Sequence, residues 1–259
     1  MAKVIVATMS EWHQVQRKYA LEIDVAYLKD LFPNESDEDI QKMFDDLVKL
    51  YNKKFTFILN ANNYGVGGSL KILFNYLLDK NFTYLINLQS SDHYEINQVL
   101  NNFLKTKPSE TNLDYYLHSR FLKPEDTKKY SFLRKIANLV FIKLTKILTK
   151  CNFSDPGMSV FMIKKNLCNI MTKEEFKSMS SSSHYPHLMN IILHKHVKTY
   201  KELDIRWRNG NTKSHLNCFS YPILLLVNLI SYKINGYFIK YSNKNNFKFQ
   251  ILTNKLLSK

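Results

Sequence analysis

About the first ninety residues alternate between short apolar segments and longer amphipathic ones, and this alternation most limits the folds open to the chain. The short segments are rich in apolar and β-branched residues, as buried strands are; they cover 3–8, 22–28, 55–60 and 82–88. The longer segments predict helices at 10–19, 36–54 and 70–80. The strongest, 36–54, begins at a capping serine, continues with three acids and repeats apolar residues at helical spacing. Strands and helices linked in this order predict an α/β fold with a mostly parallel sheet between helices.

Ligands of such sheets bind beyond the carboxyl ends of the strands. Three polar segments occupy such positions, namely 29–30, 62–69 and 89–92. The middle one is glycine-rich, so its backbone can approach a ligand closely, and the helix that follows favours anions. It fits neither the phosphate-binding loop G-x-x-x-x-G-K-[ST] nor the dinucleotide motif G-x-G-x-x-G. A tight turn without a ligand explains it equally well.

The second half of the chain opens with a basic amphipathic helix at 130–150. This helix can rest on a membrane surface, although such a helix more often packs its apolar face on its own domain. A strand at 160–165, a serine-rich loop at 178–187, a helix that starts at Tyr185 and a strand at 200–207 follow. The sequence shows no internal repeat.

Lysine and arginine outnumber aspartate and glutamate by 37 to 22. This excess attracts nucleic acid, phosphorylated small molecules or an anionic membrane, or simply forms a soluble basic surface. A basic nucleic-acid-binding protein is the less favoured alternative function. No nucleic-acid partner is expected, because the aromatic residues form no alternating strand platform and no helix-turn-helix or zinc-finger pattern occurs. The three cysteines have no C-x-x-C spacing, and the longest apolar run, 222–230, is half a membrane span. We therefore expect a cytoplasmic protein, with attachment to the cytoplasmic face of a membrane as one option.

The order of the motifs resembles a known family. An acid after the second strand, a glycine loop after the third and an acidic cluster after the fourth resemble the nucleotide-sugar domain of family-2 glycosyltransferases, which have the GT-A fold. The segments "FSDPGMSVFMIKK" (153–165) and "KELDIRWRNGNTKSHLN" (201–217) continue the resemblance. The second is especially similar to polyprenyl-phosphate sugar transferases such as dolichyl-phosphate mannose synthase. The resemblance spans roughly 22–217.

The resemblance implies transfer of a sugar, with inversion, from a nucleoside-diphosphate sugar to a lipid-phosphate or saccharide acceptor. Residues 1–217 would form the catalytic domain, and 218–259 an apolar and basic tail that can lie on a membrane surface. Asp155 would be the catalytic acid near the acceptor, and Asp92 would bind Mg²⁺ or Mn²⁺. The nucleotide sugar would contact Asp30, Asn63, Gly65, Gly67, Gly68, Gln89 and Ser91, and the diphosphate or acceptor would contact Arg206, Arg208 and Lys213.

The chain departs from the family at the acidic motifs. Where the family has D-x-D after the fourth strand, this chain has Gln89 and two serines, and Asp92 follows one place later. Neutral oxygens can bind a hard cation, but each replaces a negative charge. Three alternatives follow: weak metal binding through Asp92 and substrate phosphates, neutralisation of the diphosphate by Arg206, Arg208 and Lys213 instead, or loss of activity with retention of a binding or scaffold role.

Each of these motifs also has a purely structural explanation. Asp155 precedes Pro156 and Gly157, so it can simply cap a turn. The basic segment 206–215 can be a solvated loop. The histidines at 184, 187, 194 and 196 do not converge on one helix face, so we interpret them as single surface residues rather than a zinc site. The serine run 180–183 lacks the G-x-S-x-G elbow of serine hydrolases.

Overall fold

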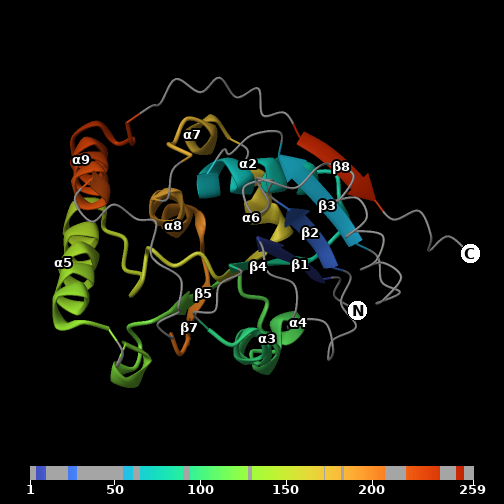
Figure 1. Ribbon diagram of the computed structural model, residues 1–259, viewed down its shortest axis with the longest axis horizontal. Coiled ribbons are helices and arrows are strands. Elements are labelled where there is room, and N and C mark those ends of the chain that lie inside the picture. The colour runs from blue at the N-terminus through green and yellow to red at the C-terminus, as the bar shows by residue number, and fades with distance from the viewer. Residues whose placement is uncertain are drawn as a thin grey trace, which may run out of the picture.

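A computed structural model describes residues 4–9, 23–27, 55–60, 65–89, 94–127, 130–171, 173–181, 184–207, 220–239 and 249–253 (Figure 1). Its strands are β1 (Val4–Met9), β2 (Ile23–Tyr27), β3 (Phe55–Asn60), β4 (Tyr84–Gln89), β5 (Tyr115–Ser119), β6 (Phe161–Lys164), β7 (Tyr200–Asp204) and β8 (Phe249–Thr253). Its helices are α2 (Gly65–Leu77), α3 (Ile96–Lys105), α4 (Pro108–Thr111), η2 (Pro124–Thr127), α5 (Phe132–Thr149), α6 (Lys165–Ile170), α7 (Glu174–Lys177), α8 (Tyr185–His196) and α9 (Ser220–Asn235). Strands and helices therefore form a mixed α/β fold.

The strands form a five-stranded sheet in the order β1-β4-β6-β5-β7 and a three-stranded sheet in the order β2-β3-β8. Strands β1 and β2 are in contact, so the two sheets adjoin (Figure 1). Strand β1 is parallel to β4, β5 is parallel to β7, and β6 is antiparallel to both β4 and β5. It follows that β1, β4, β5 and β7 all end at the same edge of the larger sheet, where β6 begins. We call this the carboxyl edge.

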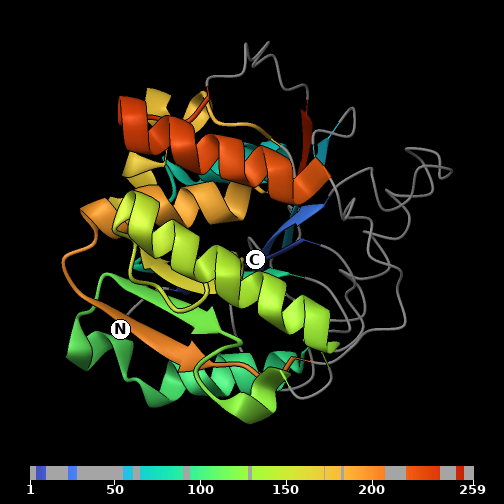
Figure 2. The same cartoon turned by 90° about the vertical axis from the view of Figure 1, so that its left-hand side faces the viewer.

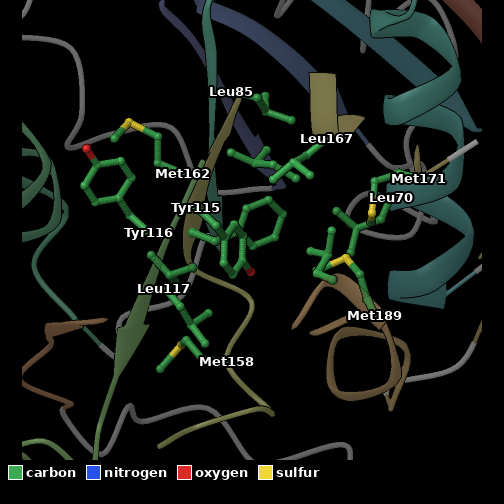
Figure 3. Close-up of a cluster of buried hydrophobic side chains, with 14 of the residues drawn as sticks. Leu70, Leu85, Tyr115, Tyr116, Leu117, Met158, Met162, Leu167, Met171 and Met189 are labelled. Atoms are coloured by element: carbon green, nitrogen blue, oxygen red, sulfur yellow. The ribbon is translucent and has the colours of Figure 1, made fainter. Parts of the chain in front are cut away.

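Helices cover both faces of the larger sheet. Helices α2, α6 and α8 lie on one face and α3 and α4 on the other, while α5 and α9 lie side by side beyond one end (Figures 1 and 2). Strand β5 is buried along its whole length because both of its faces are covered. Figure 3 shows Tyr115 on the side of Met189 and Leu70, and Tyr116 on the other side. Tyr116 meets the ring of Phe103 on α3, edge to face, with 6.3 Å between centroids.

The expected α/β class is confirmed, and most predicted strands lie within one or two residues of their expected bounds. Three details differ. The segment 65–69, expected as loop, is the first part of α2. The last expected strand ends at Asp204 rather than at 207. The expected tail contains α9 and β8, and β8 pairs with β3. The helices expected at 10–19 and 36–54 lie outside the described residues.

No helix among the described residues is long and apolar enough to span a membrane.

Candidate functional site

A buried ion pair lies at the carboxyl edge. Arg120 directly follows β5, and Asp155 lies in the turn before β6, so both belong to the same end of the sheet. The guanidinium of Arg120 donates to both carboxylate oxygens of Asp155, from Nε at 2.6 Å and from Nη2 at 2.8 Å, and its backbone N–H donates to Oδ2 at 3.2 Å. The side chain of Asp155 is 2% exposed and that of Arg120 is 13% exposed. This two-point geometry fixes the orientation of both groups.

Aromatic residues enclose the guanidinium of Arg120. Its Nη1 donates to the hydroxyl of Tyr130 at 3.2 Å, and the central carbon of the guanidinium, Cζ, lies 5.1 Å from the ring centroid of Trp207. Burial by itself lowers the pKa of Arg120, but the charge and hydrogen bonds of Asp155 and Tyr130 raise the pKa above its ordinary value. The guanidinium is therefore a fixed cation. Three of its five N–H groups donate the bonds above; the other two make no hydrogen bond to any residue that the structure describes.

The first turn of α8 lies against this ion pair. A Cβ atom added to Gly157 would sit 3.5 Å from His187 Nδ1, 3.8 Å from Arg120 Nη2 and 3.9 Å from Asp155 Oδ1. The Nε2 of His187 is hydrogen-bonded to the hydroxyl of Thr145 on α5 at 2.8 Å. Burial lowers the pKa of His187 to about 4, with a smaller opposing contribution from Asp155, so the imidazole is neutral at neutral pH. We call Arg120, Tyr130, Asp155 and His187 the Arg120 cluster.

The turn that carries Asp155 is anchored by the core. Asn190 on α8 donates to the backbone carbonyls of Pro156 and Met158, both at 2.8 Å, and accepts from the hydroxyl of Tyr115 at 2.7 Å. Because a fully buried amide with these bonds has little freedom, it fixes the position of the turn relative to α8 and β5. Asp155 therefore does more than cap a turn, since its carboxylate is committed to Arg120.

A second carboxylate lies next to the Arg120 cluster. Glu202 on β7 accepts hydrogen bonds from the backbone N–H of Ser154 at 2.7 Å and from its hydroxyl at 2.8 Å. The hydroxyl of Ser154 also lies 2.6 Å from that of Ser119 at the end of β5. Burial raises the pKa of Glu202, and the two bonds from Ser154 oppose that rise. These bonds tie the end of β5 and the middle of β7 to the segment before β6.

The described glycines of the predicted loop have a packing role. Gly65, Gly67 and Gly68 belong to α2, so the prediction of an open loop there was wrong. A Cβ atom added to Gly67 would lie 2.6 Å from Cβ and Cγ of Tyr185 and 2.8 Å from Cα of Ser181. The N–H of Gly67 donates to the carbonyl of Ser181 at 2.9 Å. Gly67 thus lets α2 approach the first turn of α8, the turn that also carries His187.

Several predicted site residues come to the carboxyl edge. Gln89 is the last residue of β4, and Arg206 lies two residues beyond the end of β7, with an exposed side chain. Tyr94, two residues after Asp92 in the sequence, packs on Trp207 with 5.9 Å between ring centroids. Trp207 in turn covers Arg120. The other predicted site residues, Asp30, Asn63, Ser91, Asp92, Arg208 and Lys213, lie outside the described residues.

The sequence did not reveal the basic and histidine members of the Arg120 cluster. Arg120 follows a strand that was not predicted, and no pattern in the sequence links it to Asp155, which lies 35 positions away. The interpretation of the histidines as surface residues was wrong for His184 and His187, which are buried. The sequence did contain one indication of this burial: both histidines lie at most four positions before the largely apolar segment 188–193 of α8.

The chain is similar in fold to glucosyl-3-phosphoglycerate synthase from Mycobacterium tuberculosis. With the complex of that protein with Mn²⁺, UDP-glucose and phosphoglyceric acid, the TM-score is 0.53 at 6% identity, over 90% of this chain and 79% of the other. With its UDP complex the values are 0.52 and 8%, over 89% and 80%. No family model matches the sequence, and no curated protein matches it. The GT-A-like fold predicted from the motif order is confirmed by this similarity.

The metal prediction rests on a part of the chain that the structure does not describe. Among the described residues, no three histidine, cysteine, aspartate or glutamate side chains come together as a metal site. The donors predicted from the sequence comprise one carboxylate, Asp92, with neutral oxygens from Gln89 and Ser91. Such a set fits a hard divalent cation, but weakly, because it supplies one negative charge where two carboxylates would supply two.

Proposed function

We propose that the chain is a glycosyltransferase that moves a sugar from a nucleoside-diphosphate sugar to an acceptor. The observation that carries this proposal is the meeting of Gln89, Arg206 and the Arg120 cluster at the carboxyl edge. That edge is where ligands of α/β sheets bind. The similarity of fold to a protein in complex with UDP-glucose supports the proposal.

We assign the nucleotide sugar to the predicted residues after β2, β3 and β4. Asp30 would contact the nucleoside, and Asn63, Gly65 at the start of α2, Gln89 and Ser91 would line the donor; Gly67 and Gly68 are buried in the packing of α2 and are not assigned to it. Bound Mg²⁺ or Mn²⁺ would neutralise charge on the departing diphosphate, held by Asp92 and substrate oxygens. Arg206, Arg208 and Lys213 would add positive charge at the diphosphate. A fold-related protein in complex with Mn²⁺ supports the metal assignment.

The Arg120 cluster is assigned to the acceptor, and its chemistry favours an anionic group. At neutral pH it presents a permanent cation, a neutral imidazole and two N–H groups of Arg120 not bonded within the described part of the chain. A phosphate oxygen accepts such bonds readily and needs no general base to attack the sugar. Asp155 then orients Arg120, whereas activation of a saccharide hydroxyl would require Asp155 to exchange its bonds to Arg120 for one to the acceptor. We therefore propose a lipid-phosphate acceptor ahead of a saccharide, with inversion at the sugar as in family-2 enzymes.

Calorimetry with UDP and with GDP, each with and without manganese, tests the donor assignment. We expect binding by the wild type and loss of binding in Asp30→Ala and Asp92→Ala. Asp79→Ala is the matched control, because Asp79 is exposed beyond the far end of α2 and should leave binding unchanged. Absence of binding for both nucleotides under both conditions would refute the proposal.

Gly157→Ala tests the acceptor assignment. The added methyl group meets its neighbours at ordinary contact distances, so the fold tolerates it, but it fills space next to Arg120 Nη2 and His187 Nδ1. With an acceptor bound there, KM for the acceptor should rise about tenfold while nucleotide binding stays unchanged. An unchanged KM would remove the acceptor from this position.

A second candidate is a binding or scaffold protein that has kept the fold without the activity. The replacement of both aspartates of D-x-D, by Gln89 and by Ser91, favours it. Release of UDP or GDP from a nucleotide sugar by the purified chain, abolished in Asp92→Ala, would eliminate this alternative. A cytoplasmic location belongs to the glycosyltransferase proposal.

A further inference from the structure

The strongly exposed large apolar side chains gather on two helices. Of fifteen such side chains among the described residues, six lie on α5 and five on α9. The two most exposed are Leu133 at 78% and Phe132 at 76%. The full set on the two helices is Phe132, Leu133, Ile136, Leu139, Val140, Ile147, Ile223, Leu224, Val227, Ile230 and Ile234. We call this set the α5–α9 surface.

Each helix carries one apolar stripe toward the core and another toward solvent. On α9 the exposed side chains recur at helical spacing, from Ile223 through Val227 and Ile230 to Ile234, while Leu225 and Leu229 are buried on the opposite side. On α5 the exposed stripe lies opposite Thr145, the one fully buried residue of that helix. The expected packing of the apolar face of α5 on its own domain therefore accounts for only part of that face.

The two helices form one continuous surface. They contact each other and lie together at the front of the molecule in Figure 2, with no described element in front of them. Scattered exposed apolar residues are ordinary, but a contiguous set over two adjacent helices marks an interaction surface.

The charge on these helices identifies the partner. Neither helix contains an aspartate or glutamate, whereas α5 carries Arg134, Lys135, Lys143 and Lys146, and α9 carries Lys233. A second copy of the chain would bring two such basic surfaces together, in a protein whose formal net charge is +15. Apolar side chains interleaved with lysines whose stems can reach out of an apolar layer are the composition of helices that lie in a lipid interface.

We propose that the α5–α9 surface docks the protein on an anionic lipid membrane, with the exposed apolar side chains in the interface and the lysines at the headgroups. Electrostatic attraction per lysine near an anionic membrane corresponds to about a fivefold gain in affinity. The proposal stands on this surface alone and does not depend on sugar transfer.

The inner side of α5 contacts the candidate acceptor site, and that of α9 contacts His184, which directly precedes the helix that carries His187. Thr145 of α5 is hydrogen-bonded to His187, and the ring of Tyr221 on α9 meets that of His184 with 6.1 Å between centroids. Docking would therefore place the membrane one helix thickness from the Arg120 cluster. On the proposed function, this arrangement brings a lipid-phosphate acceptor within reach of its site.

Co-sedimentation with vesicles tests the docking. The purified chain should sediment with vesicles of phosphatidylcholine and phosphatidylglycerol, but not with vesicles of phosphatidylcholine alone. The double variant Phe132→Ser/Leu133→Ser should weaken binding at least tenfold, and Lys143→Gln and Lys146→Gln about fivefold each. Leu104→Ser and Lys105→Gln are the matched controls, because both side chains are exposed on α3, which is not part of the α5–α9 surface, and should change nothing.

Circular dichroism and thermal unfolding verify that each variant is folded, and Ile223→Ser/Ile234→Ser on α9 provides a second pair if the first fails to fold. No sedimentation with anionic vesicles, or equal binding by wild type and both apolar double variants, would overturn the proposal. A dimer in sedimentation equilibrium that either double variant dissociates would also overturn it, in favour of a second copy. Nucleotide calorimetry on the same samples separates this failure from failure of the glycosyltransferase proposal.

Discussion

The ion pair between Arg120 and Asp155 makes a strong prediction about stability. Replacing Asp155 by asparagine keeps the shape of the side chain but removes the negative charge, and Arg120 stays buried and charged. Removing one partner of a buried ion pair typically costs about 3–5 kcal/mol, because the remaining charge is uncompensated. The two short bonds, at 2.6 and 2.8 Å, and the 2% exposure of the carboxylate place this pair in that class. A loss of about 4 kcal/mol is a large part of the stability of an ordinary domain.

Urea unfolding at neutral pH, followed by circular dichroism, measures this loss. The exposed pair of Lys107 and Glu110 is the internal control: its atoms lie 3.1 Å apart, but its side chains are 67% and 65% exposed. Exposed pairs are worth about 0–1 kcal/mol, so Glu110→Gln should change the free energy of unfolding by less than about 1 kcal/mol.

A double-mutant cycle, with Arg120→Met and Asp155→Leu made singly and together, separates the pair from general damage to the site. In Arg120→Met/Asp155→Leu neither charge remains, and apolar replacement of a buried pair is often nearly neutral. The double variant should therefore be at least about 2 kcal/mol more stable than Asp155→Asn. A cost below about 1 kcal/mol for Asp155→Asn, or a double variant as unstable as the sum of its single variants, would show that water screens the pair and would refute the reasoning.

Three further changes have expected outcomes. Burial lowers the pKa of His187 to about 4, below the roughly 6.5 of an unfolded histidine. Between pH 6.5 and pH 4 the unfolded chain therefore binds a proton that the folded chain does not, and the free energy of unfolding falls by up to about 3 kcal/mol as the pH is lowered. His187→Gln should remove that part of the pH dependence in urea titrations across this range. Gly67→Ala should destabilise by about 1–2 kcal/mol despite its better helix propensity, because its methyl group overlaps Tyr185, whereas Gly157→Ala should stay within about 0.5 kcal/mol in the same thermal unfolding assay. Thr145→Val should cost about 1–3 kcal/mol by leaving a buried nitrogen of His187 unpaired, and an unchanged midpoint in urea would contradict that hydrogen bond.

The strands that could be predicted are those with a clear local sequence pattern. The four early strands carry dense apolar runs, and their placement needs no knowledge of the rest of the chain. Strand β5 was missed because "YYLHS" is buried on both faces and includes a histidine and a serine, so no alternation of apolar and polar residues marks it. The start of α2 was missed because Gly65, Gly67 and Gly68 are poor helix formers in isolation, and packing against Tyr185 overrides that preference.

The candidate site was predictable only in its position along the chain. Strand order placed Gln89 at a strand end, and the family resemblance supplied Asp155 and Arg206. The strand register shows that the positions of these residues share one edge. The partners of Asp155 were beyond prediction, because Arg120 and His187 reach it through tertiary packing. For α5, periodicity indicated an apolar face, but only the fold shows that a second apolar stripe points outward.

The distribution of buried polar groups gives an independent reason to regard the carboxyl edge as functional. Burying a polar group costs free energy unless it is hydrogen-bonded, so a core under no other constraint is apolar. Here Asn87, His118, Asp155, His187 and Asn190 are all at most 5% exposed. Asn87 Oδ1 and both ring nitrogens of His118 have no hydrogen-bond partner among the described residues. Burial lowers the pKa of His118 to about 3, so this histidine, like His187, lowers the free energy of unfolding at low pH. Because the unpaired groups of Asn87 and His118 reduce stability, their place near the carboxyl ends of β4 and β5 supports the proposal that this edge serves binding and chemistry.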